Sequence, residues 1–97
     1  MKKTITFRHM ESSDALKNHA YEKIDKLEKY GNNMPEAHII LSVEGHNRHL
    51  AEVNFAAKEV NAIGKAETSD MYASIDDAVA KLEQSIKKHN DKIRAQS

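Results

Sequence analysis

Two segments with apolar residues at every third or fourth position enclose three segments in which apolar and polar residues alternate. The first spacing predicts amphipathic helices, and the second predicts strands with one buried face. A short alternating segment at residues 4–8 precedes them all. The resulting order, βαβββα, strongly constrains the fold, because neither helix could bury its apolar stripe alone. We therefore expect an α+β fold in which a four-stranded sheet carries both helices on one face.

The first helix is expected over residues 14–30. Ser12 or Ser13 can cap its start, and Asp14 suits the positive end of the helix dipole. Gly31 is the kind of residue that commonly ends a helix. The apolar stripe of this helix consists of Leu16, Ala20, Ile24 and Leu27.

The clearest strand covers residues 37–44, and the turn at 45–48 leads into a third strand at 51–55. A weaker fourth strand is expected over residues 60–66. Small side chains on one face of it, including Gly64, suggest that a helix approaches closely. The last helix is expected over residues 71–94 and is capped by Ser69 or Asp70. Its predicted buried stripe consists of Ile75, Ala78, Leu82, Ile86, His89 and Ile93.

The length of 97 residues predicts a single domain, 1–97. The chain contains no cysteine, which excludes disulfides, thiolate catalysis and cysteine-based zinc sites. No apolar run approaches the roughly 20 residues needed to span a bilayer. The first ten residues alternate like a strand and do not resemble a signal peptide. We therefore expect a cytoplasmic protein without a membrane partner.

The residue types used in catalysis are present, but not in catalytic patterns. His46 and His49 have HxxH spacing, yet they lie on a turn entering a strand, which favours a polar hairpin over a metal site. Asp76 and Asp77 are adjacent and would point about 100° apart on a helix, so they cannot share a proton. No nucleophile elbow or phosphate loop is present. We expect no enzyme activity, no metal and no cofactor.

The charge is balanced, with 15 basic and 15 acidic residues, but the lysines are sorted on the helices. On the first helix, Lys23 and Lys26 flank one side of the stripe, with Lys29 further round. On the second, one flank carries Lys81, Lys88 and Lys92, and the opposite flank carries Asp76 and Glu83. Sorted lysines suit binding to successive phosphates. They are also typical of the solvated shoulder of an amphipathic helix, with pairs such as Glu22–Lys26, and periodicity alone favours that reading.

Several sequence segments favour phosphate binding over the solvated-shoulder interpretation of these lysines. They are DMYASID at 70–76, KL at 81–82, KKHNDK at 87–92, DAL at 14–16, EKIDKLEKY at 22–30 and HIILSVE at 38–44. Together they resemble the ribosome hibernation and translation-inhibitor family, in its short form. The resemblance implies a fold similar in outline to double-stranded RNA-binding domains. It also implies a monomer that binds small-subunit rRNA in the mRNA and tRNA channel and idles ribosomes under stress or in stationary phase.

By this resemblance, the RNA-binding positions are Lys23, Lys26, Lys29, Lys81, Lys88 and Lys92. Lys87 and Arg94 are weaker candidates, because they fall toward the other side of the helix. The chain departs from the family pattern at Gln84 and Ser85, where an Arg-Gln pair is common, and at Asn90, where a basic residue is common. Two alternatives stay open, a generic double-stranded RNA-binding module and a protein-interaction domain that regulates transcription.

Overall fold

The computed structural model describes residues 1–30, 34–58 and 60–96, with the side chains of the last helix as far as His89. Its elements are β1 (Lys2–Arg8), α1 (Asp14–Asp25), the short 3₁₀ helix η1 (Glu28–Tyr30), β2 (Glu36–Glu44), β3 (Arg48–Ala57), β4 (Val60–Thr68) and α2 (Met71–Gln96). The predicted order βαβββα is confirmed, and η1 is an addition to it.

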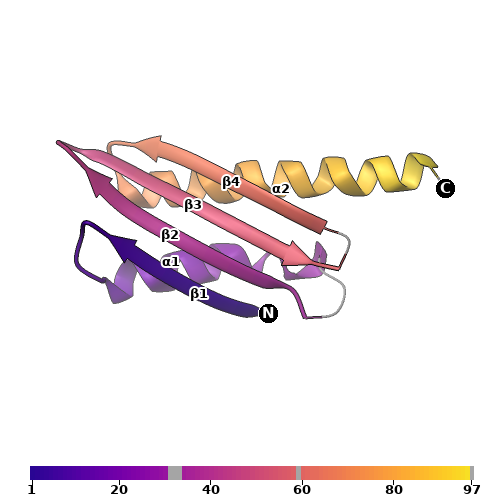
Figure 1. Cartoon of the computed structure of the whole chain (residues 1–97), viewed down its shortest axis with the longest axis horizontal. Coiled ribbons are helices and arrows are strands. Elements are labelled where there is room, and N and C mark those ends of the chain that lie inside the picture. The colour runs from indigo at the N-terminus through magenta and orange to yellow at the C-terminus, as the bar shows by residue number, and fades with distance from the viewer. Residues whose placement is uncertain (31–33, 59, 97) are drawn as a thin grey trace.

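The four strands form one mixed sheet in the order β1-β2-β3-β4. β1 runs parallel to β2, with Ile5 opposite Ile39, and the other two pairings are antiparallel. The parallel pairing needs a crossover connection, which α1 supplies. Figure 1 shows both helices on the same side of the sheet, with α2 alongside β4 and α1 behind β1 and β2.

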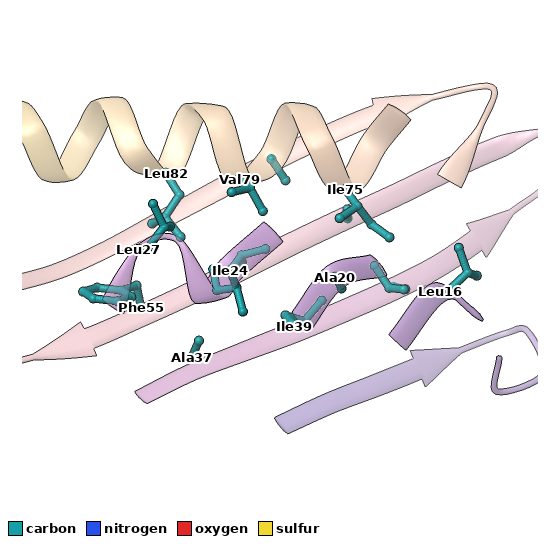
Figure 2. Packing of buried hydrophobic residues seen from close by; sticks show 14 of the residues in the cluster. Leu16, Ala20, Ile24, Leu27, Ala37, Ile39, Phe55, Ile75, Val79 and Leu82 are labelled. Atoms are coloured by element: carbon teal, nitrogen blue, oxygen red, sulfur yellow. The ribbon is translucent and has the colours of Figure 1, made fainter. Parts of the chain in front are cut away.

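The hydrophobic core lies between the helices and the sheet (Figure 2). It includes Leu16, Ala20, Ile24 and Leu27 beside Ile39, Phe55, Ile75, Val79 and Leu82. The predicted stripe of α2 is buried as far as Ile86, whereas His89 is only half-buried. Ile93 lies among the side chains that are not described. The opposite face of the sheet carries no helix in the described part of the chain, and Ile63 is 55% exposed there.

The predicted end of the first helix is wrong, because α1 ends at Asp25 rather than at Tyr30. The Leu27 amide donates to the Ile24 carbonyl at 2.9 Å, and the Tyr30 amide donates to the Leu27 carbonyl at 3.0 Å. Such three-residue spacing tightens the winding into a 3₁₀ turn. Leu27 stays 1% exposed through this change, so its burial did not require a continuous α-helix. Gly31, the predicted terminator, lies outside the described residues.

The helix starts agree with prediction, whereas the strands extend further than predicted. Ser13 caps α1 by accepting from the Leu16 amide at 3.2 Å, and Asp70 caps α2 by accepting from the Ala73 amide at 3.3 Å. β4 continues to Thr68, which pairs with His49 of β3. Ladder pairing continues past the region of apolar alternation, and for this reason the sequence pattern underestimated strand length.

The face of β4 that carries small side chains lies directly against the backbone of α2. A Cβ atom added to Gly64 would lie 2.1 Å from the Ala78 carbonyl oxygen and 2.9 Å from the Leu82 Cβ. The expected close approach of a helix is therefore confirmed. This contact fixes α2 against β4 and so decides which way each flank of α2 faces.

Candidate nucleic-acid interface

The two flanks of α2 face different neighbours. On one flank, the His19 Nε2–H donates to Asp76 Oδ1 at 2.8 Å, and the Tyr30 hydroxyl donates to Glu83 Oε2 at 3.1 Å. On the other flank, the Lys81 Nζ donates to the Lys65 carbonyl of β4 at 3.2 Å. The acidic flank of α2 therefore faces α1, and its basic flank faces the outer edge of the sheet.

A groove with a volume of about 270 Å³ separates α1 from α2. One wall is basic and belongs to α1 and its C-cap, and the other is acidic and belongs to α2. The floor between them is apolar, and Figure 2 labels two of its members, Leu27 and Val79. The residues that line this interhelical groove are Lys23, Lys26, Leu27, Asp76, Val79, Ala80 and Glu83.

The structure divides the predicted lysines into two sets. Lys23 and Lys26 line the interhelical groove, whereas Lys81 lies on the far side of α2 beside β4. Lys88 is exposed seven positions after Lys81 and therefore shares its flank. Lys29 lies in η1, with its ammonium 5.2 Å from the centre of the Tyr30 ring. Helical spacing grouped Lys23 with Lys26 and Lys81 with Lys88, but it did not reveal that α2 separates the two pairs.

The remaining basic candidates on α2 are Lys87, Lys92 and Arg94. The side chains of Lys92 and Arg94 lie outside the described residues. Lys87 is exposed, and helical spacing places it on the acidic side of α2, away from Lys81. It therefore stays a weaker candidate than Lys88.

The ion pairs of the described residues use other cations. They join the N-terminus to Glu28, Lys3 to Asp25, His9 to Glu44, His19 to Asp76, Arg48 to Glu67 and Lys65 to Glu52. Within that part of the chain, Lys23, Lys26 and Lys81 enter no ion pair, and neither does Lys88. The Glu22–Lys26 pair of the solvated interpretation does not form. Among the described carboxylates, none would have to be displaced from these ammonium groups by an external anion.

An ion pair with two hydrogen bonds joins β3 to β4 at the hairpin end of the sheet. The Arg48 guanidinium donates to Glu67 Oε1 at 2.9 Å and to Oε2 at 3.3 Å. This hydrogen bonding lowers the pKa of Glu67 and raises the pKa of Arg48. Both side chains are exposed, so the pair is a surface feature of β3 and β4.

Tyr21 of α1 and Tyr72 of α2 have different surroundings. Tyr21 is half-buried, and its hydroxyl donates to the Lys3 carbonyl of β1 at 3.4 Å. Tyr72 is 41% exposed, and its ring meets the His19 ring edge to face at 5.0 Å. Tyr72 therefore supports the histidine that holds Asp76.

No cluster of three or more metal-ligating side chains occurs in residues 1–30, 34–58 and 60–89. The described helices likewise include none with the length and hydropathy needed to cross a bilayer.

Comparison with known proteins defines the class to which this fold belongs. Residues 4–94 match the model of the family described as Sigma 54 modulation protein / S30EA ribosomal protein. The chain therefore belongs to that family.

Two relatives carry the name ribosome hibernation promotion factor. The one from Staphylococcus aureus (strain COL) is 33% identical over 87 residues, which is 88% of this chain and 46% of the relative. The one from Lactococcus lactis subsp. cremoris (strain MG1363) is 35% identical over 95 residues, which is 96% of this chain and 51% of the relative. The chain thus spans about half the length of these curated relatives.

Two solved structures share the fold. The N-terminal domain of protein Y from Thermus thermophilus matches with a TM-score of 0.80 and 30% identity, covering 91% of this chain and 98% of that domain. A ribosomal subunit interface protein from Coxiella burnetii matches with a TM-score of 0.82 and 21% identity, covering 94% and 99% of the two chains. The second likeness concerns the fold alone.

Proposed function

We propose that this chain is a ribosome-associated inhibitor that binds small-subunit rRNA in the mRNA and tRNA channel. Its bulk then blocks both ligands of the channel, so ribosomes stay idle under stress or in stationary phase. The inhibition is steric, and no reaction is catalysed. Residues 1–97 act as one ribosome-binding domain, as a monomer in the cytoplasm.

The observation that carries the proposal is a set of ammonium groups on both sides of α2 that form no ion pair with any described residue. Lys23 and Lys26 offer cations in the interhelical groove, and Lys81 and Lys88 offer them on the outer flank. Each lysine that neutralises a phosphate releases condensed counterions, which favours binding and makes it sensitive to salt. Family membership supports the ribosome as the source of those phosphates.

The test is a charge reversal on the outer flank, in which Lys81, Lys88 and Lys92 are changed together to Glu. We expect the variant to lose co-sedimentation with vacant small ribosomal subunits. A matched control changes Lys2, Lys17 and Lys58 to Glu, since these lysines lie outside the proposed interface and alter the net charge equally. Unaltered binding by the first variant would contradict the proposal, as would equal loss in both. Tight binding of the wild type to free duplex RNA without ribosomes would favour a generic RNA-binding module.

A further inference from the structure

The interhelical groove combines opposite charges in a way that restricts its ligand. Lys23 and Lys26 form a wall that repels cations, and Asp76 and Glu83 form a wall that repels anions. A bare phosphate or a bare cation would therefore meet like charge on one side. A ligand that carries an anionic group and hydrogen-bond donors a few ångströms apart would satisfy both walls at once.

The acidic wall is held in place by α1 and η1. His19 binds one oxygen of Asp76, and Tyr30 binds one oxygen of Glu83. An ionised carboxylate has about four lone-pair sites on its two oxygens, so each of these groups retains acceptor capacity after its internal bond. The edge contact of Tyr72 with the His19 ring, at 5.0 Å, further restricts that histidine. The acceptors thus face the groove in a fixed orientation before any ligand arrives.

The apolar floor and the volume of the groove further restrict which ligand it can bind. Leu27 and Val79 are 1% and 9% exposed, and with Ala80 they form an apolar surface between the two charged walls. The volume of about 270 Å³ lies below the roughly 300–1,000 Å³ typical of sites that enclose a drug-sized ligand. The groove therefore suits one flat group that stays partly exposed.

An unpaired RNA nucleotide has all of these properties. It carries a phosphate, a 2′-hydroxyl that can donate, N–H groups on the base edge and a flat base face. Proteins read RNA mainly through such unpaired bases, because the major groove of an RNA duplex is too narrow for side chains. We propose that the interhelical groove takes one unpaired nucleotide of rRNA, with its two flanking phosphates on Lys23 and Lys26 and its donors on Asp76 and Glu83. This inference rests on the proposed function and assigns the acidic residues a role in selecting RNA.

The competing explanation is that Asp76 and Glu83 only balance the charge of the lysines. The two explanations predict effects of opposite sign. If the acids merely repel phosphate, removing their charge strengthens RNA binding. If they accept hydrogen bonds from the nucleotide, removing their charge weakens binding, even though the net charge becomes more favourable.

The experiment measures the Kd for vacant small ribosomal subunits at one fixed salt concentration, for the whole chain and for Asp76→Asn and Glu83→Gln. Because a hydrogen bond to a charged group is among the stronger ones, we expect each variant to bind about tenfold more weakly. Asp77→Asn is the matched control, since it removes the same charge from the next residue of α2, which is exposed and does not line the groove. It should bind as tightly as the wild type or slightly more tightly.

A third variant, Ala80→Leu, fills the groove without changing charge, and Ala80 is exposed, so the fold should tolerate the larger side chain. It should also bind about tenfold more weakly. Urea unfolding of each variant shows whether its fold is intact. Binding by Asp76→Asn and Glu83→Gln that equals or exceeds that of Asp77→Asn would overturn the inference and leave the proposed function standing, and so would unchanged binding by Ala80→Leu. Absence of binding by the wild type would overturn both.

Discussion

The contact of α2 with β4 and its contact with α1 are built in opposite ways. Against β4, the helix backbone approaches so closely that only a glycine fits, at Gly64. Toward α1, His19 and Tyr30 form hydrogen bonds to Asp76 and Glu83 of α2, and the interhelical groove remains open between the helices. The first contact leaves no room for a ligand, whereas the second leaves room, charge and unused acceptors. A single helix can therefore be fixed by close backbone contact on one flank and leave a groove open on the other.

A methyl group at Gly64 is the most severe test of the close contact between α2 and β4. In Gly64→Ala the new Cβ would lie 2.1 Å from the Ala78 carbonyl oxygen, so α2 must move. We expect the free energy of unfolding to fall by about 3 kcal/mol, at the upper end of the usual cost of overpacking. Urea denaturation measures the loss. Gly45→Asn is the control, because Gly45 has open space around it and asparagine tolerates its φ of +53°. Equal midpoints for wild type and Gly64→Ala would show that the contact is not tight.

Removal of a buried hydroxyl also tests the contact between α2 and the sheet. Ser74 is fully buried, and its Oγ donates to the His49 carbonyl at 2.7 Å and lies 2.7 Å from the Thr68 hydroxyl. Ser74→Ala leaves that carbonyl without this donor, which should cost about 2 kcal/mol of unfolding free energy. Ser85→Ala, an exposed position of the same helix, should change stability by less than about 0.5 kcal/mol. Thermal unfolding of both variants checks the difference, and similar melting temperatures would contradict it.

The two lysine sets allow the two sides of α2 to be compared in binding. Changing Lys23 and Lys26 to Ala should reduce the salt dependence of binding to small subunits by about one unit of slope per lysine. Changing Lys81 and Lys88 to Ala should do the same. If only one of the two double variants changes the salt dependence, the RNA lies on a single side of α2 and the expectation of contacts on both sides is wrong. Lys58→Ala, in the turn between β3 and β4, should leave the slope unchanged.

The smallest expected effect concerns acid stability at the hairpin end. The hydrogen bond from Arg48 holds the pKa of Glu67 below its ordinary 4.5, so the carboxylate stabilises the fold above that pH. This contribution is lost as the pH falls through the lowered pKa of the folded state. Wild type should therefore lose more stability than Glu67→Gln between about pH 6 and about pH 3. The difference should be small and should shrink in high salt, because both side chains are exposed. Thermal unfolding of both proteins across this pH range tests the prediction, and an identical loss of stability in the two would contradict it.

The sequence predicted the anchored side of α2 better than the open side. Burial follows periodicity, so the stripe from Ile75 to Ile86 and the small face around Gly64 could be inferred from local pattern. The end of α1 could not, because a 3₁₀ turn buries Leu27 as well as an α-turn does.

The interhelical groove was not predictable from the pattern of either helix alone. Helical spacing placed Asp76 and Glu83 on one flank and the lysines of α1 on another, but it did not reveal that the two flanks face each other. That relation depends on the close approach of α2 to β4, which fixes the rotation of the helix. The hydrogen bonds of His19 and Tyr30 to α2 likewise depend on tertiary structure.

The most direct test of the account is the affinity of the wild-type chain for vacant small ribosomal subunits as a function of salt. Docking of Lys23, Lys26, Lys81 and Lys88 on phosphates predicts a linear fall of the logarithm of affinity with the logarithm of salt concentration. The expected slope is about −3 to −4, since each neutralised phosphate contributes roughly 0.7 to 0.9. No co-sedimentation at low salt, or an affinity that does not change with salt, would contradict the account and direct the search to a protein partner.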